Sequence, residues 1–184
     1  MRLRISPVPR RRSRGTCNPG PAIAVRTINP LTIQSQKPIR DAVKGKASRY
    51  GKLDLPYVIA VNAMGDYAKE ESVIDALFGT PGVRATQASS GQCEQREIRS
   101  PDGVWHNGTK PTHTRVSAVL STERLKSWSL GQRRARLVLN PWAQMPLPDL
   151  PFGIDTWRAD SAALRKSDGA SLADIFGLPD GWPE

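Results

Sequence analysis

The chain of 184 residues has little of what several protein classes require. It contains two cysteines, Cys17 and Cys93, which excludes a scaffold held together by several disulfides. No segment approaches the roughly 18–20 consecutive apolar residues of a membrane-spanning helix, so no membrane span is predicted. The GxSxG, GxxxxGK(S/T) and GxGxxG motifs are absent, which argues against serine hydrolases, P-loop nucleotide hydrolases and Rossmann dehydrogenases.

Histidine is as scarce as cysteine, and the acidic residues form no recognisable catalytic set. His106 and His113 are the only histidines, whereas a zinc site needs three or four closely spaced ligands. A carboxylate–metal site needs at least two converging acids. The acids considered for such a role are Asp54, Asp66, Glu70, Glu71 and Asp75. None of them forms a convincing pair in the sequence, which therefore predicts no catalytic residue, no cofactor and no metal site.

Acidic residues are missing altogether from the first forty positions. Residues 1–53 carry thirteen basic residues against one acid, Asp41, which is a net charge of +12. Residues 54–184 carry fourteen basic and sixteen acidic residues, a net charge of −2. A basic block attracts the phosphates of DNA or RNA, and it is equally typical of a solvated, disordered arm. Both interpretations stay open at this point.

Apolar spacing predicts one folded domain between two poorly ordered ends. Residues 1–21 predict a disordered basic arm, because they combine six arginines and four prolines with no periodic apolar pattern. Residues 22–157 predict a single α/β or α+β domain with a mixed sheet and two or three helices. Residues 158–184 predict a loosely ordered C-terminal tail.

Within that domain the pattern places most elements and one long loop. Strands are expected at residues 22–28, 55–62, 104–105, 115–121 and 136–140, and helices at 38–50, 68–78, 122–132 and 171–177. Residues 55–62 predict a central strand covered on both faces, because Val58, Ile59, Ala60 and Val61 form a continuous apolar run. Residues 84–102 are polar and aperiodic, and predict a long loop.

The helix over residues 38–50 is the strongest candidate for a binding surface. Ile39, Val43 and Ala47 recur at helical spacing and predict a buried face that would orient the charges around it. A rigid row of cations beside such a face can follow nucleic-acid phosphates. The predicted nucleic-acid-binding residues are Arg40, Lys44, Lys46, Arg49 and Lys52. An ordinary solvated helix face is the alternative interpretation of the same residues.

The five tryptophans all lie beyond position 100 and suggest a different hypothesis. They do not alternate along one strand beside basic residues, so core packing or surface anchoring is their expected role. The segment of residues 141–157 is rich in proline and contains Trp142 and Trp157. Because aromatic residues are favoured at binding hot spots, this segment is the alternative candidate, the docking surface of a protein-interaction module.

Two resemblances extend these predictions. The segments IRDAVKGKASRYGKLDLPYVIAVNA and DALFG, with the later GVW, RVSAVLS and LNPWAQMPLP, resemble an uncharacterised bacterial protein family over about residues 38–150. The basic helix followed by an apolar strand also resembles the end of a restriction-endonuclease-like core, in which a strand bearing D/E-x-K precedes the helix. That strand would here be residues 22–28, where Ala24, Val25 and Arg26 replace the required acid and lysine.

The second resemblance implies a truncated core that holds none of the family's metal-binding acids. Either those acids lie upstream in a longer natural protein, or the chain is a degenerate, non-catalytic version of the core. The expected partner is then the backbone of DNA or RNA, with another protein as the alternative. The expected location is the cytoplasm, and no membrane partner is expected.

Overall fold

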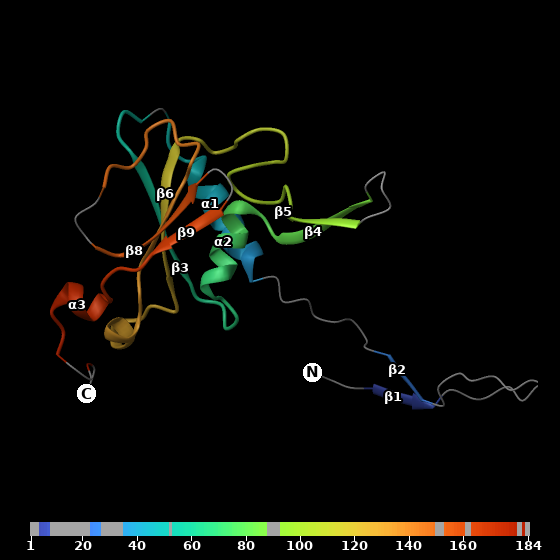
Figure 1. Ribbon diagram of the computed structural model, residues 1–184. Helices are drawn as coiled ribbons and strands as arrows, with labels where there is room; N and C mark the ends of the chain where they lie inside the picture. Colours follow the sequence, from blue (N-terminus) through green and yellow to red (C-terminus); the bar gives the residue numbers. More distant parts are fainter. Residues whose placement is uncertain are drawn as a thin grey trace, which may run out of the picture. The chain divides into compact units, whose positions relative to one another are not determined.

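The chain forms two compact units, Met1–Ile33 and Gln34–Glu184. The computed structural model describes residues 4–7, 23–26, 35–51, 53–87, 93–149, 153–160, 163–179 and 182 (Figure 1). In the first unit, β1 (Arg4–Pro7) pairs antiparallel with β2 (Ile23–Arg26), which is the strand predicted over residues 22–28. Apart from β1, the arm predicted over residues 1–21 lies outside the described residues.

A mixed sheet of five strands organises the second unit (Figure 1). Its strands lie in the order β3 (Tyr57–Ala63), β6 (Val116–Glu123), β7 (Arg136–Leu139), β8 (Asp155–Asp160) and β9 (Ala163–Ser167). β3 runs parallel to β6 and β7 parallel to β8, while the other neighbours are antiparallel. The predicted α/β class with a mixed sheet is therefore confirmed.

Two helices pack against this sheet and complete the core. α1 (Gln36–Ala47) buries Ile39, Val43 and Ala47, the apolar face predicted from their spacing. α2 (Glu70–Phe78) joins the same cluster, together with Ile59 of β3 and Val119 of β6. A 3₁₀ helix, η1 (Ser127–Gln132), replaces the helix predicted over 122–132, and α3 (Leu172–Phe176) confirms the turn predicted over 171–177. Among the described residues, no helix combines the length and apolarity needed to span a bilayer.

β3 lies at the edge of the sheet, so its prediction as a central strand was wrong. Of its seven residues, Ile59 and Ala63 are buried and Ala60 is exposed. Its described strand neighbour is β6 alone. The apolar run reflects the helices packed on one face of the strand, and the small Ala60 needs little cover on the other. A continuous apolar run therefore did not establish where the strand stands in the sheet.

Two polar regions contain strands that the sequence pattern did not show. β4 (Pro81–Gln87) pairs antiparallel with β5 (Cys93–Arg99) where a loop was predicted over residues 84–102. Half of β8, all of β9 and α3 fall in the predicted tail of residues 158–184. The strands β8 and β9 form the other edge of the sheet, where one polar face is solvated, and this weakens the alternating apolar signal.

Val104 and Trp105, predicted as a strand, instead form a buried turn. Their backbone N–H groups donate to Ala76 O and Leu77 O at 3.0 and 3.1 Å, and so satisfy carbonyls near the end of α2. Both side chains are fully buried, and the Trp105 ring meets Phe78 edge to face with centroids 4.9 Å apart. Helix capping and core packing explain this apolar pair without a strand.

Candidate functional site

Four basic residues gather where α1 ends and β6 begins. Lys44, Lys46 and Arg49 come from the end of α1 and the turn after it, and Arg115 immediately precedes β6. The Arg115 guanidinium donates to Tyr50 O at 2.7 Å, to Gly51 O at 3.0 Å and to Ala47 O at 3.3 Å. These contacts fix the cation at the carbonyl end of the helix, where the helix dipole favours positive charge. We name Lys44, Lys46, Arg49 and Arg115 the α1 cation cluster.

The pKa of His113 reflects the positive charge of the α1 cation cluster. Burial lowers the pKa of His113, and the charges of Lys44 and Arg115 lower it further. His113 is therefore mostly neutral at pH 7, and it adds little to the charge of the cluster. Arg115 contacts Ala47 O, one turn of α1 after Lys44, so the two cations lie in the same region although they are distant in sequence.

Two tyrosines stand beside the same cations. Tyr57 Oη donates to Lys46 O at 3.0 Å, and its ring meets Tyr50 edge to face with centroids 5.5 Å apart. Tyr50 is 55 % exposed. Lys46 Nζ donates to Ala60 O at 3.2 Å, so its ammonium lies beside β3. The result is a basic surface with one accessible aromatic ring.

The structure separates Arg40 from the other predicted binding residues. Its guanidinium pairs with Asp102 at 2.7 Å, and its side chain is only 15 % exposed. Burial raises the pKa of Asp102, but hydrogen bonds from Thr80 and the charge of Arg40 outweigh burial and hold that pKa below its ordinary value. Arg40 thus ties α1 to the segment after β5. Lys52, also predicted to bind, lies outside the described residues.

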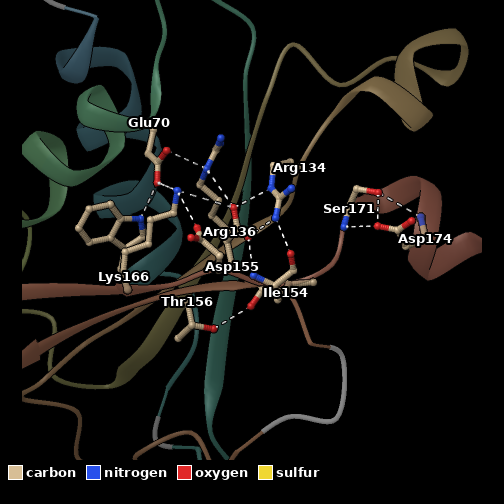
Figure 2. A network of polar contacts seen from close by, with 12 residues as sticks. Glu70, Arg134, Arg136, Ile154, Asp155, Thr156, Lys166, Ser171 and Asp174 are labelled. Atoms are coloured by element: carbon tan, nitrogen blue, oxygen red, sulfur yellow. Dashed lines mark hydrogen bonds and ion pairs between the residues drawn. The ribbon is translucent and has the colours of Figure 1, made fainter.

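A second polar cluster lies at the opposite end of β3 and β6, and Figure 2 shows it. Its centre is Asp155, whose side chain is fully buried. Arg134 donates to the two oxygens of Asp155 at 2.9 and 2.7 Å, and the Gly169 N–H donates at 2.8 Å. Gly169 must be glycine for this approach, because a Cβ there would lie 2.0 Å from Gly153 O. The cluster therefore joins β7, β8 and the segment after β9.

Glu70, at the start of α2, connects the helix to this cluster. Trp157 Nε1 donates to Glu70 Oε1 at 2.7 Å, and Arg136 Nε lies 3.2 Å from Glu70 Oε2. Lys166 Nζ lies 3.4 Å from Glu70 Oε1, and Arg136 also bonds to Glu123. We name this set the Asp155 network, and it comprises Glu70, Glu123, Arg134, Arg136, Asp155, Trp157 and Lys166.

The charges of the Asp155 network balance one another. Three carboxylates face three cations, and each carboxylate has at least one cationic partner. The hydrogen bonds from Arg134 lower the pKa of Asp155, and they outweigh the opposing effect of burial. Burial lowers the pKa of Lys166, but Asp168 and Glu70 outweigh it and raise that pKa. These ion pairs connect α2, β6, β7, β8 and β9, so the network holds strands and helix together.

Of the acids considered for metal binding, Glu70 alone belongs to this network. Asp75 pairs with Arg99 at 3.0 Å and Asp66 lies 3.7 Å from Arg124, while Asp54 and Glu71 are exposed. Within the described ranges, no three His, Cys, Asp or Glu side chains are grouped so as to hold a metal ion. Sequence reasoning missed Arg115, Asp155 and Arg136 because each acts through partners distant in the chain.

The tryptophans of the proposed docking segment face different surroundings. Trp142 is 38 % exposed and lines a groove of about 880 Å³ with Pro141, Phe78, Ile98 and other residues. Trp157 is bonded to Glu70 in the Asp155 network and is not among the residues that line this groove. The two ends of the segment at residues 141–157 therefore do not form one surface.

Comparison of the chain with protein families, with curated proteins and with solved structures found no match.

Proposed function

We propose that this chain binds the sugar–phosphate backbone of DNA or RNA through the α1 cation cluster. The observation that carries the proposal is the convergence of Arg115 with Lys44, Lys46 and Arg49. Among the described residues, no carboxylate forms an ion pair with any of these four cations. Asp41, on the same helix, is paired with Lys37 at 2.7 Å. The cluster thus holds positive charge that a phosphate can neutralise.

Binding of this kind is electrostatic and independent of base sequence. Each phosphate contact releases counterions, so the logarithm of affinity falls with the logarithm of salt concentration by about 0.9 per contact on duplex DNA. Up to four contacts therefore give a slope of about −3.6. Within this proposal α1 and β3 correspond to the helix and strand of a truncated restriction-endonuclease-like core. The proposal includes the cytoplasm as the location, since nucleic acid is accessible there.

Charge reversal at Lys46 and Arg49, the two exposed cations of the α1 cation cluster on the helix and the turn after it, tests the proposal. The double variant Lys46→Glu with Arg49→Glu is expected to bind duplex DNA weakly and to lose about 1.8 from the salt slope, because two phosphate contacts disappear. The measurement is fluorescence anisotropy with labelled duplex over a salt series. Both side chains are exposed, so the fold is expected to persist, and circular dichroism checks this.

Lys37→Glu is the matched control for this experiment. Lys37 is an exposed cation on the same helix, but it is already paired with Asp41 and lies outside the α1 cation cluster. Its reversal is expected to leave the salt slope unchanged. Equal binding by wild type and the double variant would contradict the proposal.

A protein-docking role is the second candidate, and the groove beside Trp142 favours it. Phe78, Val83, Ile98, Trp142 and Leu164 give the groove an apolar lining, and Val83 is 64 % exposed. The lining also contains two acids, Glu97 and Asp160, and one base, Arg99, so its net charge is negative. The fitting occupant is an extended apolar segment of a partner protein with a basic residue beside it.

Trp142→Ala tests this second candidate by comparison with Trp128→Ala, a change at another exposed tryptophan outside the groove. Removal of the Trp142 indole is expected to weaken capture of the partner by more than tenfold, as at interface hot spots. The measurement is pull-down from a nuclease-treated lysate with quantitative mass spectrometry. A partner that wild type and both variants capture equally would rule out docking in this groove.

A further inference from the structure

A pocket lined by cations and one tryptophan lies just beyond the end of β6. It measures about 410 Å³ and is lined by Arg124, Lys126, Trp128, Ser129, Gln132 and Arg133. Trp128 is 63 % exposed, and Lys126 Nζ lies 5.3 Å from the centre of its ring. Three of the six lining residues are cations and none is an acid. We name this the Trp128 pocket.

The backbone that carries the Trp128 pocket is held in place by β3. Asn62 Oδ1 accepts the Leu125 N–H at 3.0 Å, and Asn62 Nδ2 donates to Leu125 O at 2.8 Å. The buried Ser129 Oγ accepts the Lys126 N–H at 3.1 Å and so fixes the start of η1. Arg124 has a φ of 51°, which non-glycine residues seldom adopt. The exposed indole and its cations are therefore presented by an ordered turn.

The cations of this pocket keep unused hydrogen-bonding capacity. Arg133 Nε is buried and has no hydrogen-bond partner among the described residues. Arg124 lies 3.7 Å from Asp66, whose side chain is 81 % exposed, so this ion pair is long and solvated. Lys126 is exposed and contacts the Trp128 ring. The pocket thus combines free positive charge with an accessible aromatic surface.

We propose that the Trp128 pocket binds single-stranded nucleic acid, with an unpaired base stacked on Trp128 and the adjoining phosphates bound by Arg124, Lys126 and Arg133. An aromatic ring beside basic residues is the usual combination in single-strand binding, since every base offers a face for stacking. Paired bases are already stacked in a duplex and are not available to the indole. The three cations of the lining supply the charge complementary to the phosphates of such a strand.

This inference rests on the proposed function for its class of ligand, but it uses different residues. The α1 cation cluster lies at the end of the β3–β6 pair where Tyr57 meets Val116, and the Trp128 pocket follows the end where Ala63 meets Glu123. Seven residues of β3 separate the two ends, which corresponds to about 20 Å. Each site can therefore be removed without touching the other.

The test compares Trp128→Ala with Trp142→Ala, which removes another exposed indole that has no place in the pocket. The probes are a labelled oligothymidylate, the same strand with abasic sites, and a duplex, all followed by fluorescence anisotropy. Trp128→Ala is expected to weaken oligothymidylate binding by about 5–150-fold, the range for loss of one stacked base. Trp128→Phe is expected to restore most of the affinity, and Trp142→Ala to change nothing.

The abasic strand distinguishes binding by base stacking from binding by charge alone. The duplex distinguishes the Trp128 pocket from the α1 cation cluster. Trp128→Ala is expected to bind the abasic strand and the duplex as wild type does. Equal oligothymidylate binding by wild type and Trp128→Ala would overturn the inference while leaving the proposed function standing. Unchanged duplex binding by Lys46→Glu with Arg49→Glu would instead overturn the proposed function. Displacement of oligothymidylate by thymidine monophosphate at equal concentration would assign the pocket to free nucleotides and overturn the single-strand inference.

Discussion

Replacing Asp155 by alanine is expected to lower the free energy of unfolding by about 1–3 kcal/mol, as is typical when buried hydrogen-bonding groups lose their partner. The Asp155 side chain is fully buried and accepts two hydrogen bonds from Arg134 and one from the Gly169 N–H. Its loss leaves the N–H and part of the guanidinium without an acceptor, and leaves Arg136 with less compensating charge. Urea unfolding followed by tryptophan fluorescence measures the change.

The matched control for Asp155→Ala is Asp149→Ala. Asp149 also pairs with an arginine, Arg158, but both side chains are largely exposed, at 89 % and 58 %. Exposed pairs contribute about 0–1 kcal/mol, so little loss of stability is expected from this variant. If the two variants lost equal stability, Asp155 would not be a structural centre of the fold.

The Asp155 network has consequences for where function resides in this chain. It lies at the carboxyl ends of the parallel strands β3 and β6, an edge where open α/β sheets commonly bind ligands. In this chain, however, the carboxylates at that edge already form ion pairs with Arg134, Arg136 and Lys166. The unused positive charge lies farther out, in the Trp128 pocket, and at the opposite end, in the α1 cation cluster. The Trp128 pocket therefore follows the edge that these ion pairs occupy, and the α1 cation cluster lies at the other end of the β3–β6 pair.

Local patterns in the sequence were sufficient to predict the elements that form the core. The spacing of Ile39, Val43 and Ala47 predicted the buried face of α1 because helical periodicity depends only on neighbours within the helix. The apolar segments at β6 and β7 were predicted for a similar reason, since most of their residues are buried. Where burial is strong and local, the pattern alone identified the element.

Elements that depend on distant partners were not predicted. β9 has the sequence ALRKS, and only its pairing with β8 makes it a strand. β3 has the apolar sequence of a central strand but lies at the edge, because strand order is decided by long-range pairing. The same limit applied to the sites. Basic residues on α1 were visible in the sequence, but the convergence of Arg115 with them, and the diversion of Arg40 to Asp102, depend on contacts between distant segments.

Acid is expected to destabilise the fold from about pH 5 downward, with the effect concentrated in Asp155 and Asp102. In the folded chain, hydrogen bonds and ion pairs hold the pKa of both carboxyls below their ordinary value of 3.8. In the unfolded chain the same groups take up protons near that ordinary value. The unfolded state therefore binds more protons as the pH falls, and the stability that these carboxylates provide at neutral pH is lost as the pH passes down through their folded pKa values.

The variant Asp155→Asn tests how much of this acid dependence comes from the carboxyl group of Asp155. Asparagine carries no charge at any pH, so the variant is expected to be less stable than wild type at pH 7. As the wild-type carboxyl becomes protonated in acid, the difference between the two proteins is expected to shrink. Urea unfolding at a series of pH values measures it, with Asp149→Asn as the exposed control. A difference between wild type and Asp155→Asn that stayed constant between pH 7 and the acid limit would show that the charge of Asp155 does not stabilise the fold, and that its contribution is one of shape and hydrogen bonding alone.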